Sequence, residues 1–141
     1  MGNADERARP GSPPRPLLVM IVDDDADFAW MLSTGLENVG FATEVHLSAL
    51  GLSARLLKEP PVDVVLLDCR MPALTGPSVL ELLGRHPRLM NIPVVLMSAS
   101  PDFREAVANR PGAMFIEKGG RLKPLISLVQ DLMKASTASN P

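Results

Sequence analysis

Residues 62–72 read VDVVLLDCRMP, an apolar run that reaches an aspartate and then turns at Met71-Pro72. Short apolar runs of the same kind recur along the chain. Together they cover Leu17–Val22, Phe41–Val45, Val62–Leu67, Ile92–Met97 and Ala113–Ile116. Several are nearly continuous in Val, Ile and Leu, which is typical of strands that are covered on both faces.

The segments between these runs carry apolar residues at helical spacing. We expect one helix from Ala26 to Val39 that Gly40 ends. Its predicted inner face consists of Phe28, Met31, Leu32, Leu36 and Val39. Further helices are expected over Ser53–Lys58, from Pro77 to Leu83, over Asp102–Asn109 as a short and weak one, and from Leu122 to Met133.

Five strands that alternate with helices predict an α/β fold in three layers. Right-handed crossovers then give a doubly wound parallel sheet with helices on both faces. We expect the flavodoxin-like strand order 2-1-3-4-5, in which functional residues gather at the carboxyl ends of the strands.

The length of 141 residues fits one domain with short tails. Residues 1–16 are rich in Pro and Arg and are interpreted as a flexible leader. Residues 17–135 form the predicted domain, and residues 136–141 are expected to be a flexible tail. On this division no sequence remains for a separate output domain.

Charge and apolar content exclude several classes of partner. The formal net charge of −2 indicates neither a nucleic-acid-binding nor an anionic-membrane surface. No apolar run is long enough to span a bilayer. Cys69 is the single cysteine, so no internal disulfide can form, and we expect a reducing cytoplasmic location.

Acidic, hydroxyl and basic side chains follow four of the five apolar runs. Asp23, Asp24 and Asp25 come after the first run, Asp68 after the third, Ser98 after the fourth and Lys118 after the fifth. If the first and third strands are neighbours, Asp23, Asp24 and Asp68 must lie close together. Like charges so close raise one another's pKa unless a cation compensates.

Two cations can compensate this acidic group. Mg²⁺ takes oxygen ligands, typically carboxylates together with waters and substrate phosphate. Lys118 adds a fixed positive charge from the last strand. Such a site suits phosphoryl transfer, in which a carboxylate can be the nucleophile and form an aspartyl phosphate.

Each of these residues also has a plain structural interpretation. Asp25 is interpreted as a helix cap, and Asp23 and Asp24 taken alone could form a solvated turn. Taken alone, Ser98 could simply bond to backbone. Cys69 is interpreted as a small hydrophobic residue without a chemical role. The plain interpretations do not explain why these residues occur together at successive strand ends.

The ordered set resembles the receiver domains of bacterial response regulators over Leu17 to Ala135. The matching elements are Val22-Asp23-Asp24, Asp68-x-x-Met71-Pro72, Ser98-Ala99 and Lys118, in that order. The resemblance implies that Asp68 is the phosphoacceptor. It implies a Mg²⁺ site made by Asp24 directly, Asp23 chiefly through water, Asp68, and the backbone carbonyl of Arg70.

The resemblance also implies roles for three further residues. Ser98 and Lys118 would contact phosphoryl oxygens, and Phe115 would be the aromatic switch residue that moves with Ser98. Two departures stand out: Lys118 precedes Gly119-Gly120 where the family usually has proline, and the fourth helix is short. The sequence therefore supports the phosphorylation chemistry better than it supports the family's usual mode of output.

The function expected from the resemblance is a phosphorylation-dependent switch of protein interactions. A histidine kinase or phosphotransfer protein would donate the phosphoryl group, and a downstream protein would be the target, with homodimerisation as one mode of output. Beyond its own phosphorylation and dephosphorylation, the chain is not expected to be an enzyme. The main alternative is a receiver-like interaction module that works without phosphorylation.

Two further alternatives have less support. A phosphatase that uses Asp68 as nucleophile would be expected to carry Asp two residues later, where Arg70 stands. A flavin-binding module would need a Ser/Thr/Gly-rich loop after the first strand, and Asp23 to Asp25 stand there instead.

Overall fold

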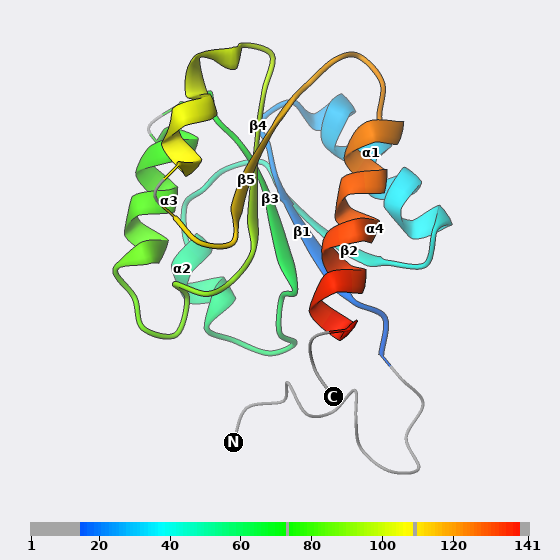
Figure 1. Ribbon diagram of the computed structural model, residues 1–141, viewed down its shortest axis with the longest axis horizontal. Coiled ribbons are helices and arrows are strands. Elements are labelled where there is room, and N and C mark those ends of the chain that lie inside the picture. Colours follow the sequence, from blue (N-terminus) through cyan, green and yellow to red (C-terminus); the bar gives the residue numbers. More distant parts are fainter. Residues whose placement is uncertain (1–14, 73, 109, 139–141) are drawn as a thin grey trace.

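The structure is a computed structural model that describes residues 15–72, 74–108 and 110–138 (Figure 1). Five parallel strands form one sheet in the order β2-β1-β3-β4-β5, which confirms the predicted α/β fold and strand order. The leader expected over residues 1–16 lies outside the described residues, except for Arg15 and Pro16.

The strands are short and closely follow the predicted apolar runs. Their bounds are β1 Leu18–Val22, β2 Ala42–His46, β3 Val64–Asp68, β4 Val94–Ser98 and β5 Ala113–Glu117. Across the sheet, Val22 pairs with Leu67, Asp68 with Met97 and Ser98 with Glu117. The carboxyl ends of β1, β3, β4 and β5 are therefore aligned at one edge.

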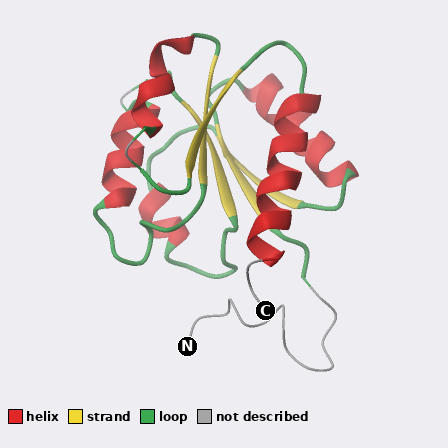
Figure 2. Cartoon of the chain, in the orientation of Figure 1, coloured by secondary structure: helices red, strands yellow, loops and turns green. Residues whose placement is uncertain are grey.

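Helices cover both faces of this sheet (Figure 2). They are α1 Ala26–Asn38, α2 Leu52–Leu56, α3 Gly76–Gly84, the 3₁₀ helix η2 Pro101–Val107 and α4 Lys123–Ala138. In the described residues none is long and apolar enough to cross a bilayer. The α1 and α4 helices lie on one face, and α2, α3 and η2 lie on the other.

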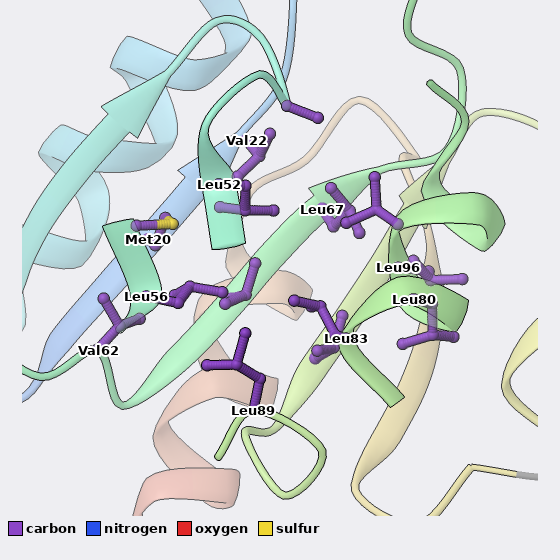
Figure 3. Close-up of a cluster of buried hydrophobic side chains, with 14 of the residues drawn as sticks. Met20, Val22, Leu52, Leu56, Val62, Leu67, Leu80, Leu83, Leu89 and Leu96 are labelled. Atoms are coloured by element: carbon purple, nitrogen blue, oxygen red, sulfur yellow. The ribbon is translucent and has the colours of Figure 1, made fainter. Parts of the chain in front are cut away.

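Two apolar clusters, one on each face, hold the layers together. Alternate residues of the same strands supply them, because successive side chains of a strand point to opposite faces. Figure 3 shows one cluster, to which Met20, Val22 and Leu67 belong together with Leu80 and Leu83 of α3. On the other face Val19, Ile21, Val64, Leu66 and Val95 pack against α1 and α4. Packing on both faces fixes the orientation of each strand. It therefore also fixes where the residues that follow the strand lie.

The first helix begins and ends as its sequence indicates, but its buried face differs from the prediction. Asp25 caps the helix by accepting a hydrogen bond from the Phe28 amide at 3.1 Å, which confirms it as a cap. Met31 and Val39, expected to be inside, are 57% and 45% exposed. Ala29 and Ser33 are buried instead, since small side chains let the helix lie close to the sheet.

Three other bounds differ from the expected ones. The helix expected over Ser53–Lys58 is α2, which ends at Leu56. The α4 helix continues to Ala138, past the expected start of the tail at Ser136, and residues 139–141 lie outside the described residues. The short fourth helix begins at Pro101 as a 3₁₀ helix, and none of its seven residues is buried.

Candidate functional site

Three carboxylates meet at the carboxyl edge of the sheet, where β1 and β3 are neighbours. Oxygen atoms of Asp23, Asp24 and Asp68 all lie within 4.8 Å of one another. Asp23 is completely buried and Asp68 is 6% exposed, whereas Asp24 is exposed to solvent. The predicted acidic group is therefore present, with one carboxylate open to incoming ligands.

Backbone contacts hold the loop that carries Asp23. Its amide donates to the His46 carbonyl at 3.0 Å, which fixes the loop to the end of β2. One carboxylate oxygen, Oδ1, accepts a hydrogen bond from the Asp25 amide at 3.0 Å. Since Asp25 also caps α1, the acidic loop and the start of the helix are one rigid unit.

Lys118 reaches into this group from the end of β5. Its Nζ lies 2.6 Å from Asp23 Oδ2 and 3.2 Å from Asp68 Oδ1. Its backbone amide donates to the Ser98 carbonyl at 2.8 Å, which ties the ends of β4 and β5 together. The lysine therefore bridges the two buried carboxylates.

The electrostatics of the site follow from burial and these contacts. Burial, followed by the charge of Asp23, raises the pKa of Asp68, and Lys118 opposes part of this rise. Burial alone would lower the pKa of the Lys118 ammonium, but the hydrogen bond and charge of Asp23 and the charge of Asp68 outweigh it and raise that pKa. The amine thus stays charged, and the acidic group still carries excess negative charge.

Ser98 lies at the end of β4, one strand from Asp68. The side chain is only 1% exposed, and its Oγ accepts a hydrogen bond from the Ser100 amide at 3.1 Å. As an acceptor in that bond, the hydroxyl keeps its own proton for another partner. Ser98 is placed where the sequence predicted it, at the same edge as the carboxylates.

Gly76 is a positioning element that the sequence reasoning missed. Its amide donates to the Cys69 carbonyl at 3.0 Å, and a Cβ built there would lie 2.8 Å from Cys69 Cα and 3.0 Å from the Asp68 carbonyl oxygen. Only glycine lets α3 start so close to the backbone of Asp68. The signal in the sequence is a glycine placed between a helix cap, Thr75, and Pro77.

The loop after Asp68 contacts the 3₁₀ helix. The Arg70 guanidinium lies 5.2 Å from the centre of the Phe103 ring, a cation–π distance. Since this contact uses the side chain of Arg70, it leaves its backbone carbonyl uninvolved. Cys69 beside it is buried, and burial raises the pKa of its thiol to about 12, so it stays protonated.

Phe115, the predicted switch residue, is half-buried on β5. The Arg104 guanidinium of η2 lies 5.0 Å from its ring centre and pairs with Glu117 at 3.2 Å. A single arginine therefore contacts both Phe115 and the residue before Lys118. Sequence reasoning missed this contact, because nothing in the pattern shows which way a short 3₁₀ helix turns its side chains.

Comparison with known proteins shows which family the chain belongs to. Residues 19–130 match the family described as the response regulator receiver domain. The chain belongs to that family. Membership of this family confirms the resemblance seen in the sequence, and the acidic group, Ser98 and Lys118 lie at the carboxyl edge of the receiver-domain sheet.

The curated relatives that this receiver domain matches are longer proteins. It is 33% identical over 116 residues to the DNA-binding transcriptional regulator NtrC of Salmonella typhimurium, covering 80% of this chain and 24% of that protein. It is 36% identical over 115 residues to the regulatory protein AtoC of Escherichia coli, covering 79% of this chain and 24% of that protein. The chain thus spans about a quarter of the length of these relatives.

Solved structures support the same fold. The receiver domain of the Francisella response regulator 1452 superposes with a TM-score of 0.73 at 28% identity, covering 86% of this chain and 99% of that one. The receiver domain of NtrX from Brucella abortus gives 0.70 at 24% identity, covering 82% and 98%, which bears on the fold alone.

Proposed function

We propose that this receiver domain accepts a phosphoryl group on Asp68 from a histidine kinase or phosphotransfer protein, in a reaction that requires Mg²⁺. The observation that carries the proposal is the bridging of Asp23 and Asp68 by Lys118 at one sheet edge, with Asp24 open beside them. A carboxylate nucleophile, oxygen ligands and a fixed cation are the groups that phosphoryl transfer to an acid needs.

The residues fit a hard divalent ion. In octahedral coordination at about 2.1 Å, ligand oxygens lie about 3–4 Å apart, and the three carboxylates already have oxygens within 4.8 Å. Asp24, Asp68, the carbonyl of Arg70 and Asp23 through water would hold it. When bound, the ion supplies positive charge beside the oxygens of the transferring group.

The chain's own residues would carry out the transfer as follows. A carboxylate oxygen of Asp68 attacks the phosphorus of the donor, and the P–N bond to the donor imidazole breaks as the O–P bond forms. The imidazole nitrogen keeps the electron pair and takes up a proton from water. Lys118 and the Ser98 hydroxyl each contact a phosphoryl oxygen and neutralise charge in the transition state.

Phosphorylation would then shift an equilibrium between two conformations. Ser98 would turn toward the phosphoryl oxygen and Phe115 would rotate with it, which would change the surface around η2 and β5. A downstream protein or a second copy of the domain would read this surface. Apart from this self-phosphorylation and its reversal, we propose no enzymatic activity for the domain.

Acetyl phosphate with Mg²⁺ tests the site assignment without a kinase. We expect one hydroxylamine-labile phosphoryl group per chain in the wild type and none in Asp68→Asn. The matched control is Asp63→Asn, which lies at the opposite edge of the sheet and should label like the wild type. Equal labelling of wild type and Asp68→Asn would refute the assignment.

A second candidate is an interaction module that works without phosphorylation. The short 3₁₀ helix with no buried residue and the Gly119-Gly120 loop favour it, because both differ from the usual output elements of the family. It predicts the same partner affinity for the wild type and for Asp68→Asn, with and without beryllofluoride. A change of affinity on adding beryllofluoride would exclude it.

A further inference from the structure

The sheet fixes the backbone on the N-terminal side of Lys118. Before it, the strand pairing and the bond to the Ser98 carbonyl fix its amide. After it come Gly119 and Gly120, both exposed and the second with φ of 78°, and a Cβ added to either would meet no atom within 4 Å. The long lysine side chain loses rotamer freedom when its ammonium is held in place, so a contact beyond the two carboxylates helps to offset that loss.

Phe28 of α1 supplies such a contact. Its ring centre lies 4.4 Å from Lys118 Nζ, well within the range in which an aromatic face attracts a cation. The Phe28 amide is bonded to the Asp25 cap, whose own amide is bonded to Asp23. The ring is thus attached to the same rigid unit that carries the acidic loop.

The environment strengthens this attraction. The Lys118 side chain is only 17% exposed, so the ammonium and the ring interact with little screening by water. Phe28, Lys118 and Gly119 also line a cavity of about 100 Å³. Space of that kind would let an unsupported lysine side chain swing away from the carboxylates.

We propose that Phe28 is a positioning residue, whose ring holds the Lys118 ammonium toward Asp23 and Asp68. A rigid loop after Lys118 would restrict the lysine in the same way, but Gly119 and Gly120 stand there instead. This inference rests on the proposed phosphorylation of Asp68. Phe28 itself touches no reacting atom. Its effect reaches the reaction only through the position of the amine.

Fluorinated phenylalanines at position 28 test the electrostatic part of the contact. Mono-, di- and trifluorinated rings keep nearly the same size but progressively weaken the negative face of the ring. With acetyl phosphate and Mg²⁺, we expect the rate constant for labelling Asp68 to fall stepwise along the series, by about threefold to tenfold in total. Equal rate constants along the series would overturn the proposal.

A spectroscopic readout tests the contact without any phosphoryl chemistry. Stacking on the ring should shift the Lys118 Cε proton resonances upfield, and Phe28→Leu should abolish the shift while Phe28→Tyr keeps it. Phe41→Leu is the packing control, because Phe41 joins the same apolar cluster but precedes β2 at the opposite edge. Unshifted Lys118 resonances in the wild type would overturn the proposal.

The two assays separate this inference from the function on which it rests. A wild type that acetyl phosphate does not label would refute the proposed function. A wild type that labels normally, together with a flat fluorination series, would refute the role of Phe28 alone. A Phe41→Leu variant that slows labelling as much as Phe28→Leu would assign the effect to packing and likewise refute it.

Discussion

The Lys118 ammonium lies 2.6 Å from Asp23 Oδ2, although the two residues are 95 positions apart in the chain. Their strands, β5 and β1, are not neighbours, because β3 and β4 lie between them. The lysine therefore crosses the carboxyl ends of two strands and closes the acidic group at that edge. Removing the oppositely charged partner of a buried charge is strongly destabilising.

Replacing Lys118 with Met should destabilise the domain in the absence of divalent ions. Asp23 is completely buried, and the change leaves its carboxylate without the ammonium, which we expect to lower the free energy of unfolding by about 3–5 kcal/mol. Added Mg²⁺ should restore more stability to this variant than to the wild type, because the amine no longer competes for the same oxygens. Urea unfolding with chelator and with Mg²⁺ measures both effects.

Lys123 provides the control for that experiment. It is exposed at the start of α4, so Lys123→Met should unfold like the wild type under both conditions. If Lys118→Met were as stable as Lys123→Met in chelator, the ion pairs of Lys118 with Asp23 and Asp68 would not stabilise the fold.

Replacing Asp68 with Asn should stabilise the domain when no divalent ion is present. Burial and Asp23 raise the pKa of Asp68, so its carboxyl binds a proton more tightly in the folded than in the unfolded state. Stability is then lost as pH rises through the folded pKa. At pH 7 in chelator we expect Asp68→Asn to gain about 1 kcal/mol over the wild type.

The pH dependence distinguishes this effect from a change of packing. The gain should shrink as pH falls toward the ordinary carboxyl value of 3.8, because the wild-type side chain then becomes neutral too. Asp131→Asn, on the exposed part of α4, should show no comparable gain. A gain that is independent of pH would contradict the electrostatic explanation.

The sequence predicted the sheet and the acidic group well for a single physical reason. Buried parallel strands need continuous apolar runs, and such runs leave their functional residues at the carboxyl ends. The correct strand order therefore places four functional residues at one edge of the sheet: Asp23, Asp68, Ser98 and Lys118. The ion pairs themselves follow from placing an amine beside two buried carboxylates.

What the sequence did not predict depends on distances between elements. Met31 was expected inside, but the α1 helix turns Ala29 and Ser33 toward the sheet, where the Ser33 hydroxyl bonds to Thr43 at 2.6 Å. Phe28 was placed on the core face, and its contact with Lys118 could not be read from periodicity. Such contacts depend on how closely a helix approaches the sheet, which apolar spacing does not encode.

The ion pair on the outer strand β2 gives a pH effect of the opposite sign. Glu44 accepts hydrogen bonds from Arg55 Nε at 2.7 Å and Nη2 at 2.9 Å, and the Arg55 bond is the main cause that lowers its pKa. Stability from a lowered acid pKa is present above the unfolded value and is lost as pH falls through the folded value.

Replacing Arg55 with Gln should therefore cost stability at neutral pH but not in acid. Because the pair is partly exposed and screened, we expect a loss of about 0.5–1 kcal/mol at pH 7, disappearing as pH falls below 4.5, the ordinary value for Glu44. Arg85→Gln, which removes the exposed pair with Glu81, should lose less. Equal losses for both arginines, or a loss that persists in acid, would contradict this account.

Arg104 should restrain the proposed switch. It stacks on Phe115 and pairs with Glu117, so it favours the present orientation of the ring. If phosphorylation requires Phe115 to rotate, Arg104→Ala lowers the free energy of that step and should raise the affinity for beryllofluoride by about twofold to fivefold. Titration in the presence of Mg²⁺, followed by Trp30 fluorescence or amide shifts, measures it.

Arg88 is the matched control for Arg104, since its side chain is exposed on the loop after α3. Arg88→Ala should bind beryllofluoride as the wild type does. Unchanged or weaker binding by Arg104→Ala would show that the arginine does not hold Phe115 back.

Replacing Gly76 with Ala should damage the site through the backbone of Asp68, the proposed phosphoacceptor. The new methyl group would lie 2.8 Å from Cys69 Cα and 3.0 Å from the Asp68 carbonyl oxygen, and neither is the end of a flexible side chain. Either α3 or the Asp68 loop must move. We expect a loss of about 1–3 kcal/mol in the free energy of unfolding, together with slower labelling by acetyl phosphate.

Gly84→Ala, at the end of the same helix, separates this clash from the general effect of alanine. A side-chain carbon there meets no atom within 4 Å, so the change should be neutral or stabilise α3 by up to about 1 kcal/mol. Its labelling rate should equal that of the wild type. If Gly76→Ala proved as stable as Gly84→Ala and labelled as fast, close contact between α3 and the loop after Asp68 would not be what positions Asp68.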